Sequence, residues 1–179
     1  LARRHLAPER HGDQDVTMRT LILMRHAKSS WETGFADHER PLNDRGELAA
    51  PRMGRWLVSQ GVSPDLVLCS TATRAHRTAE LVAGEIGQSI DVRIVKQLYL
   101  PLPQDIIEVV GTESGNASTV LVVAHNPGIS STVEECAGVA TVMPTSAAAV
   151  IDFEIDQWSD LLVEARGELR HFWRVKELV

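Results

Sequence analysis

The chain has 179 residues, of which 44% are hydrophobic and 23% charged, and its formal net charge at pH 7 is −6. This length and composition are typical of one globular domain, and the negative charge argues against general binding to nucleic acid or to anionic membranes. The two cysteines form neither a zinc pattern nor a disulfide framework, which favours a cytoplasmic protein, and no apolar run is long enough to cross a membrane. We also expect a monomer.

Residues 1–17 are rich in charged side chains and show little apolar periodicity. They lack the apolar central region of a signal peptide. We therefore expect a disordered leader over 1–17, followed by a single domain over 18–179 that begins near Met18.

The first predicted strand covers residues 20–24. Its apolar run leads directly into Arg25 and His26, and a short continuous run of this kind is typical of a strand buried on both faces. In open α/β sheets, ligands bind beyond the carboxyl ends of the strands. The strand therefore places a guanidinium and an imidazole where a binding crevice is expected.

The next elements repeat this arrangement. A helix is predicted over 45–60, capped by Asn43 or Asp44, and a second strand over 66–69 leads into a helix over 74–86. Arg74 lies in the first turn of that helix, where the helix dipole favours an anion and disfavours a cation. An arginine at this position is therefore a candidate anion-binding residue.

The second half of the chain supplies a further histidine. A short strand is predicted over 92–95, a helix over 104–110 and a clear strand over 119–124, which ends at His125; Pro127 suits the first position of the following helix. A strand is expected over 147–155, and the segments 161–165 and 168–175 are expected to form a hairpin at an antiparallel edge.

These elements predict a three-layer α/β/α sandwich with a mostly parallel central sheet and antiparallel edge strands. In such a sheet, the strand ends that carry Arg25, His26, Arg74 and His125 meet at one edge. Two arginines and two histidines form a pocket suited to phosphate, because a guanidinium presents paired donors that match phosphate oxygens.

Three motifs in this order resemble the histidine phosphatase (phosphoglycerate mutase-like) superfamily: Arg25-His26 after the first strand, Arg74-Ala75-x-x-Thr78-Ala79-Glu80 after the second, and His125-Asn126-Pro127-Gly128 after a later one. The finer similarity is to SixA-type phosphohistidine phosphatases, on the runs 25–29, 40–42 and 125–128. The resemblance covers about residues 19–175.

The resemblance implies a role for each of these side chains. His26 would attack phosphorus and carry the phosphoryl group, while Arg25, Arg74 and His125 would hold the phosphate oxygens. Ser29 and Arg40 are candidate outer contacts to phosphate or substrate. For Arg40, a salt bridge within its loop, to Asp37 or Glu39, is an equal alternative.

The chain departs from the wider superfamily at the proton donor. The region that carries an acidic residue in many members reads 98-LYLPLP-103 here, and the remaining candidates are Asp37, Asp105 and Glu108, or no enzyme acid at all. A phosphohistidine substrate needs such an acid less, because a protonated phosphohistidine ring departs as neutral imidazole. We expect no metal and no cofactor, since no acidic cluster suggests one.

The resemblance therefore favours a phosphatase for protein phosphohistidine, with a signalling or phosphotransfer protein as its partner. Two other functional hypotheses stay open: a phosphatase for a small phosphomonoester or sugar phosphate, and a non-catalytic module that binds a phospho-ligand. A thiol mechanism is disfavoured, because four residues separate Cys69 from Arg74 where the cysteine phosphatase loop needs five.

Overall fold

The computed structural model describes residues 17–32, 34–87 and 90–178, so the leader predicted over 1–17 lies outside the described residues except for its last position. Six strands form one sheet in the order β3-β2-β4-β1-β5-β6. Their bounds are β1 Met18–Arg25, β2 Leu66–Ser70, β3 Asp91–Val95, β4 Thr119–Ala124, β5 Ala148–Glu154 and β6 Glu168–Trp173.

The strand β1 lies near the middle of the sheet. It pairs in parallel with β4 and antiparallel with β5, while β2 pairs in parallel with both β3 and β4. The strand β6 adds to β5 in the antiparallel direction. The sheet is therefore parallel over four strands and antiparallel toward one edge, as the sequence predicted.

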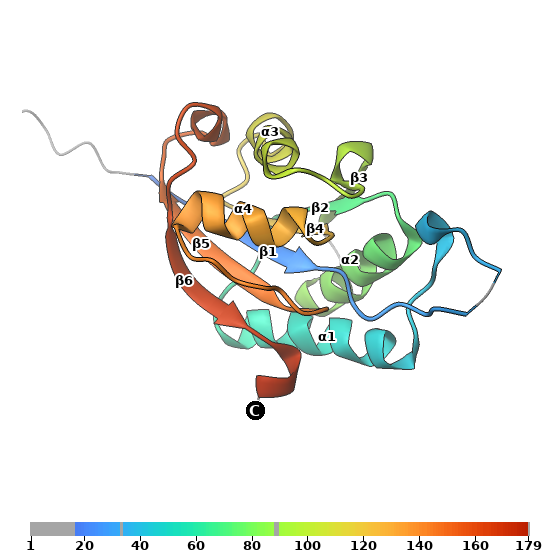
Figure 1. Ribbon diagram of the computed structural model, residues 1–179. Coiled ribbons are helices and arrows are strands. Elements are labelled where there is room, and N and C mark those ends of the chain that lie inside the picture. The colour runs from blue at the N-terminus through green and yellow to red at the C-terminus, as the bar shows by residue number, and fades with distance from the viewer. Residues whose placement is uncertain (1–16, 33, 88–89, 179) are drawn as a thin grey trace, which may run out of the picture.

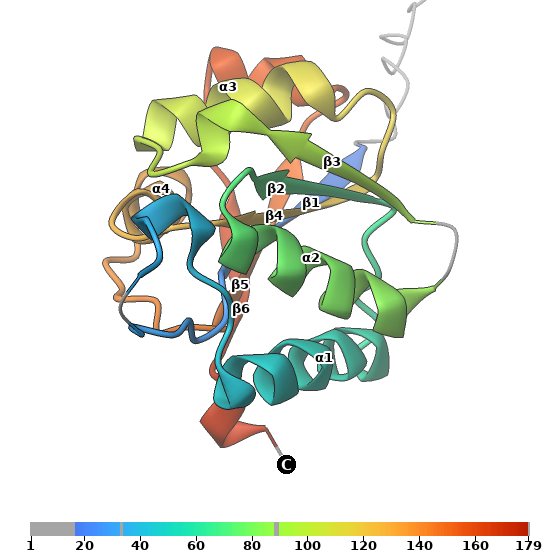
Figure 2. The same cartoon turned by 90° about the vertical axis from the view of Figure 1, so that its right-hand side faces the viewer.

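Helices cover both faces of the sheet (Figures 1 and 2). The helices α1 and α2 pack together on one face, and α3 and α4 lie on the other, as the predicted three-layer architecture requires. Their bounds are α1 Asp44–Ser59, α2 Thr73–Ile86, α3 Pro103–Glu113 and α4 Gly128–Ala137.

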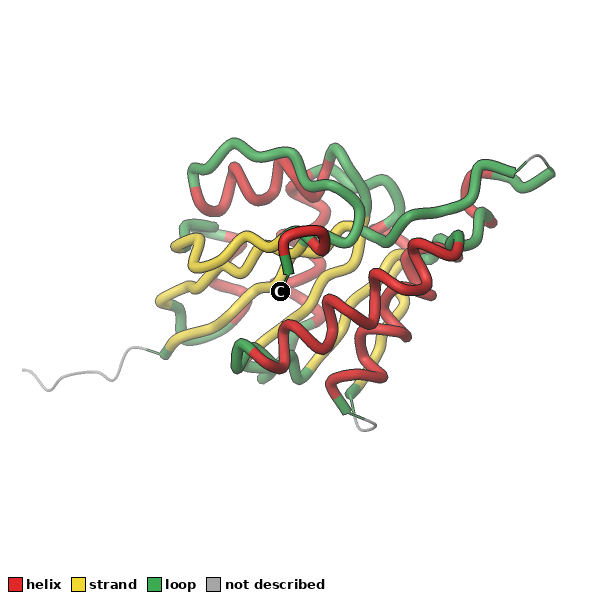
Figure 3. Tube along the Cα trace, turned by 90° about the horizontal axis from the view of Figure 1, so that it is seen from below, coloured by secondary structure: helices red, strands yellow, loops and turns green. Residues whose placement is uncertain are grey.

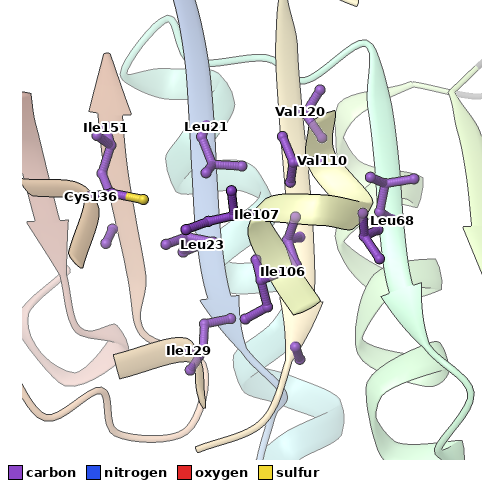
Figure 4. Close-up of a cluster of buried hydrophobic side chains, with 14 of the residues drawn as sticks. Leu21, Leu23, Leu68, Ile106, Ile107, Val110, Val120, Ile129, Cys136 and Ile151 are labelled. Carbon is purple, nitrogen blue, oxygen red and sulfur yellow. The ribbon is translucent and has the colours of Figure 1, made fainter. Parts of the chain in front are cut away.

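Successive residues of β1 serve opposite faces of the sheet. Leu21 and Leu23 belong to the core beneath α3 and α4, as Figure 4 shows, whereas Ile22 and Met24 belong to the core beneath α1 and α2. All four side chains are fully buried. This explains why the sequence of β1 is an unbroken apolar run rather than an alternating one.

A close backbone contact fixes the start of α1 against the segment that follows β1. Asn43 caps the helix by accepting a hydrogen bond from the Gly46 amide at 3.0 Å, and the Asn43 amide donates to the Lys28 carbonyl at 3.0 Å. A Cβ atom on Gly46 would lie 2.2 Å from that same carbonyl oxygen. Glycine is therefore the residue that permits this approach.

The loop between β1 and α1 extends beyond the carboxyl end of β1 (Figure 3). It contains the short helix η1, Asp37–Glu39. A second short helix, η2, Lys96–Leu98, follows β3. These two segments border the edge of the sheet where the sequence predicts a site.

The predicted hairpin of 161–165 with 168–175 is wrong. Residues Trp158–Leu162 form the short helix η3, and β6 pairs with β5 instead. Trp158 and Leu161 are both buried, and η3 packs against α3. Their spacing of three residues places both on one side of a helical turn, which a strand would not do.

Pro127 also differs in detail from the prediction. It is the N-cap residue of α4, one position before the helix begins at Gly128. A Cβ atom on Gly128 would lie 1.9 Å from the Pro101 carbonyl oxygen, so the start of α4 approaches the loop before α3 very closely. This contact sets where the helix begins.

Candidate active site

The four predicted site residues meet at the carboxyl edge of the sheet. Arg25 ends β1 and His26 follows it, Arg74 lies in the first turn of α2 after β2, and His125 directly follows β4. All four line one pocket of about 240 Å³. The pocket is also lined by Lys28, Ser29, Trp31, Arg40, Leu100, Asn126 and Thr145.

The hydrogen bonds of His26 define which ring nitrogen faces the pocket. Its Nδ1 lies 2.7 Å from the Ala27 carbonyl oxygen, which can only accept, so Nδ1 carries the proton. The Nε2 atom is then unprotonated, and its lone pair accepts a hydrogen bond from Arg74 Nε at 3.3 Å. His26 is therefore held in the tautomer that presents a nucleophilic nitrogen.

Arg74 connects the two histidines. Its Nη2 lies 3.4 Å from Nδ1 of His125, and the side chain is almost fully buried. Because Nδ1 of His125 accepts from Arg74, the proton of that ring lies on Nε2, which donates to Ser70 Oγ at 2.8 Å. The rings of His26 and His125 lie 5.0 Å apart between centroids.

Thr78 ties α2 to the segment that carries His26. Its hydroxyl donates to the Arg74 carbonyl at 2.6 Å and accepts from the Ala27 amide at 2.9 Å. The side chain is fully buried. Thr78 thereby couples the position of the arginine to that of the histidine.

Both histidines are uncharged at neutral pH. Burial, together with the charges of Arg74, Arg25 and Arg40, lowers the pKa of His26 to about 4, although the hydrogen bond to Ala27 acts in the opposite direction. Burial, His26 and Arg74 lower the pKa of His125 to about 3. A neutral imidazole is the form that can attack phosphorus.

Arg25 is the second arginine of the predicted site that lines the pocket. Its Nη1 donates to the Met143 carbonyl at 3.0 Å. Its Nε is buried and has no hydrogen-bond partner among the described residues. A buried, unsatisfied donor beside a cationic pocket favours an anionic ligand, because binding would remove the cost of leaving the donor unpaired.

The loop after β1 forms its own hydrogen-bond network around Arg40. Arg40 donates to Ser29 Oγ at 2.6 Å, to the Ser30 carbonyl at 2.9 Å and to Asp37 Oδ1 at 3.0 Å, and its guanidinium lies 3.4 Å from the ring centroid of Trp31. The alternative salt bridge to Asp37 is therefore present. Ser29 and Arg40 both line the pocket, so a contact with substrate stays a prediction.

Asp37 is held as a carboxylate. It accepts from Tyr99 Oη at 2.8 Å, from Arg40, and from Arg74 Nη2 at 3.1 Å, while Arg74 Nη1 donates to its backbone carbonyl. The hydrogen bond from Tyr99, with those from the two arginines, lowers the pKa of Asp37 to about 2 against a smaller opposing effect of burial. In this arrangement Asp37 has no proton to donate at neutral pH.

The other two candidate acids lie on α3. Asp105 accepts from the Leu102 amide at 2.7 Å and so caps the start of that helix, while Glu108 is exposed. Neither lines the pocket. Among the residues that line the pocket there is accordingly no carboxylic acid.

Sequence reasoning missed Tyr99, Ser70 and Asn126 as partners of the site. Tyr99 follows η2 and reaches Asp37, and its ring lies 5.6 Å from that of His125 between centroids. Asn126 donates to the Met143 carbonyl at 2.9 Å. Ser70 ends β2 and Asn126 lies two residues after β4, so the strand-end rule that found His125 was the available signal for these two. Tyr99 follows the short helix η2, where that rule gives no signal.

Cys69 is a fully buried residue of β2. Burial raises the pKa of the Cys69 thiol to about 12, which keeps it protonated and poorly nucleophilic.

Over residues 17–32, 34–87 and 90–178, no group of three or more His, Cys, Asp or Glu side chains is placed to hold a metal ion. No described helix is both long and apolar enough to span a membrane.

Comparison with known proteins identifies several relatives. Residues 21–99 match the family model for the Histidine phosphatase superfamily (branch 1). An uncharacterized protein of Mycobacterium tuberculosis is 36% identical over 149 residues, covering 77% of this chain and 91% of that protein. A 2,3-bisphosphoglycerate-dependent phosphoglycerate mutase of Methylorubrum extorquens is 41% identical over 75 residues, 39% of this chain and 34% of the mutase.

Solved structures share the fold. A provisionally assigned phosphohistidine phosphatase SixA from Nakamurella multipartitia is 32% identical, with a TM-score of 0.77 over 88% of this chain and 96% of its own. The protein histidine phosphatase SixA solved with tungstate has a TM-score of 0.76 at 23% identity, over 89% of this chain and 99% of its own.

Proposed function

Because this chain belongs to the histidine phosphatase superfamily, we propose that it hydrolyses protein phosphohistidine through a covalent phosphoryl intermediate on His26. The observation that carries the proposal is the orientation of His26. Its Nδ1 donates to the Ala27 carbonyl, and its unprotonated Nε2 accepts from Arg74 in the pocket, which His125 also lines.

In the first step, Nε2 of His26 forms a bond to phosphorus while the P–N bond of the substrate breaks. The electron pair of that bond goes to the departing ring, whose other nitrogen already carries a proton, so neutral imidazole leaves. In the second step, water attacks phosphorus while the bond between phosphorus and Nε2 of His26 breaks. The electron pair of that bond returns to Nε2, both protons of the water leave with inorganic phosphate, and neutral His26 is regenerated. Splitting the hydrolysis in two replaces one difficult displacement by two easier ones.

Three groups would stabilise the charge on the transferred phosphoryl group. Arg74 and Arg25 supply guanidinium donors, and Arg25 Nε is already buried and unpaired in the described structure. His125 lies beside His26 and can supply a donor once phosphate binding favours its protonated form. Such preorganised donors are the main source of catalysis in phosphoryl transfer.

The absence of a carboxylic acid from the described pocket lining supports a phosphohistidine substrate over a phosphate ester. An alkoxide leaving group needs a proton in the transition state, whereas imidazole does not. Asp37 cannot supply that proton while Tyr99, Arg40 and Arg74 hold it ionised. The name of the 32% identical Nakamurella relative points the same way.

The decisive experiment measures phosphate release, with chelator present, from a phosphohistidine protein and from a panel of small phosphomonoesters. We expect faster phosphate release from phosphohistidine than from the esters, and no release in His26→Ala. We also expect transient phosphorylation of the wild-type protein on His26. Preference for a small ester would favour the alternative enzyme. Phosphate binding without any turnover would favour a non-catalytic module.

A further inference from the structure

A second groove, of about 430 Å³, lies beside the catalytic pocket. The two share Lys28 and Thr145 in their linings, and Lys28 follows the proposed nucleophile by two residues. The groove is bounded by the first half of α1, by residues 144–146, and by the end of the chain around the short helix η4, Val175–Glu177. It therefore extends the pocket along the surface.

The groove is strongly cationic, although the whole chain carries a net charge of −6. Among the described residues, no Asp or Glu lines it, while five cationic side chains do: Lys28, Arg45, Arg52, Arg174 and Lys176. Local positive charge on an acidic protein is the pattern expected where an anionic partner binds.

Three of these cations are free to meet a ligand. Arg52 donates to the Leu178 carbonyl, and Arg174 lies 3.4 Å from Glu177 Oε1. Lys28, Arg45 and Lys176 are exposed and form no ion pair with any side chain in the described ranges. Their charges are not neutralised within the described structure.

The position of the groove is fixed relative to β1 and to His26, which follows that strand. The Lys28 carbonyl accepts from the Asn43 amide, and the close approach of Gly46 to that carbonyl sets the first turn of α1, which carries Arg45, against the segment after His26. A ligand in the groove would therefore lie at a defined position relative to the phosphoryl site.

The groove also has an apolar component. Leu48 is 73% exposed on its wall, and Ala49, Pro144 and Val175 line it as well. A small polyphosphate has no apolar surface that could pack against these aliphatic side chains. A polypeptide segment with acidic and apolar residues matches both features.

We propose that this groove binds an acidic segment of the substrate protein that flanks the phosphohistidine. The inference rests on the proposed function, since it deepens the substrate class of the same site. It predicts that the enzyme distinguishes phosphohistidine proteins by the charge of the sequence beside the phosphorylated ring. Long-range attraction would contribute mainly to the rate of association.

The test uses phosphohistidine peptides with acidic and with neutral flanks, and compares kcat/KM for the wild type with Arg45→Glu and Lys176→Glu. We expect each substitution to lower kcat/KM for the acidic peptide roughly three- to tenfold, as surface charge pairs of this kind allow, and to leave the neutral peptide unchanged. Glutamate suits the first turn of α1, so Arg45→Glu should fold.

Arg166→Glu is the matched control, because it makes the same charge change on an exposed residue just before β6, near the amino end of β1. It should leave the preference for acidic flanks intact. A preference that is absent in the wild type, or lost equally in Arg166→Glu, would overturn the groove proposal while the phosphohistidine activity stands.

A binding measurement separates the two proposals. Calorimetry with the unphosphorylated acidic peptide needs no turnover, and binding that is weakened by Arg45→Glu but not by Arg166→Glu supports the groove even if no phosphohistidine substrate is hydrolysed. Failure to hydrolyse the neutral-flank peptide contradicts the proposed function alone. Binding of inorganic pyrophosphate at these residues, with no binding of the peptide, would overturn the proposal and show that the ligand of the groove is a small polyanion.

Discussion

The Nε atom of Arg74 donates at 3.3 Å to Nε2 of His26, which is the unprotonated nitrogen of that ring. The same guanidinium reaches His125 through Nη2 and Asp37 through both Nη atoms. A single arginine thus aligns the proposed nucleophile, a second histidine and a loop carboxylate.

Replacing Arg74 with lysine keeps the charge but removes the fork of donors. A lysine ammonium cannot contact His26, His125 and Asp37 in this geometry. We expect kcat/KM for phosphohistidine to fall on the order of 10²- to 10³-fold. Arg77→Lys is the control, since Arg77 lies one turn along α2, contacts Glu47 at the surface and should tolerate the change. Equal activity of the two variants would contradict the assigned role of Arg74.

The low pKa of His26 predicts an unusual titration. In the free enzyme the ring should protonate near pH 4, because burial and the neighbouring arginines oppose its charge. Nuclear magnetic resonance of the ring protons, assigned with His26→Asn, measures this directly. A midpoint near the ordinary value of 6.5 would show that the pocket is more hydrated than the structure implies.

The lowered pKa of His26 also makes the free energy of unfolding depend on pH. Between about pH 6.5 and pH 4, the unfolded chain binds a proton at His26 that the folded chain does not, so the free energy of unfolding should fall as the pH decreases through this window. Above pH 6.5 both states are neutral and the contribution of this group is constant. Urea unfolding at a series of pH values should therefore show a weaker pH dependence in His26→Asn than in the wild type.

Removing the Tyr99 hydroxyl should alter Asp37. The hydrogen bond from Tyr99 is the largest cause of the low pKa of Asp37, so Tyr99→Phe should raise that pKa above about 2, as a carboxyl carbon titration can show. With Asp37 bound less firmly, Arg74 is less well oriented, and we expect a roughly two- to tenfold loss of kcat. An unchanged Asp37 titration would mean that the arginines alone hold the carboxylate.

Two glycines should respond oppositely to alanine. Gly46→Ala places a Cβ atom 2.2 Å from the Lys28 carbonyl oxygen and should destabilise the protein by about 1–3 kcal/mol. Gly84→Ala, in α2 with no atom outside its own stretch of helix within 4 Å of the new Cβ, should be neutral or stabilise by up to about 1 kcal/mol. Chemical denaturation of both variants tests this contrast, and a stable Gly46→Ala would mean that α1 can move away from Lys28.

The sequence predicted most of the fold, because the central strands β1, β2 and β4 contain continuous runs that are buried on both faces of the sheet. The predicted strand over 119–124 coincides with β4, and the other predicted elements before residue 155 lie within a few residues of the observed ones. The prediction of a hairpin strand over 161–165 is wrong because the burial of Trp158 and Leu161 against α3 cannot be inferred from local alternation of apolar and polar residues. The order of strands brought the four main site residues together as expected.

The network around Asp37 could not be predicted. Asp37 and Tyr99 are 62 residues apart and lie in loops, where no periodicity fixes the direction of a side chain. The two readings of Arg40 were equally compatible with the sequence, and the salt bridge to Asp37 became visible only once the loop had a conformation. Loops at a sheet edge therefore set the limit of reasoning from sequence.

The placement of β1 between β4 and β5 has a consequence for synthesis. On the ribosome, β1 emerges first, yet its register partners are residues 119–124 and 148–154. Until those segments emerge, the apolar side chains of Leu21–Met24 have no neighbouring strand. Nascent chains stalled before β4 should therefore remain sensitive to protease and depend on chaperones, and the sheet should close late, when most of the chain has been made.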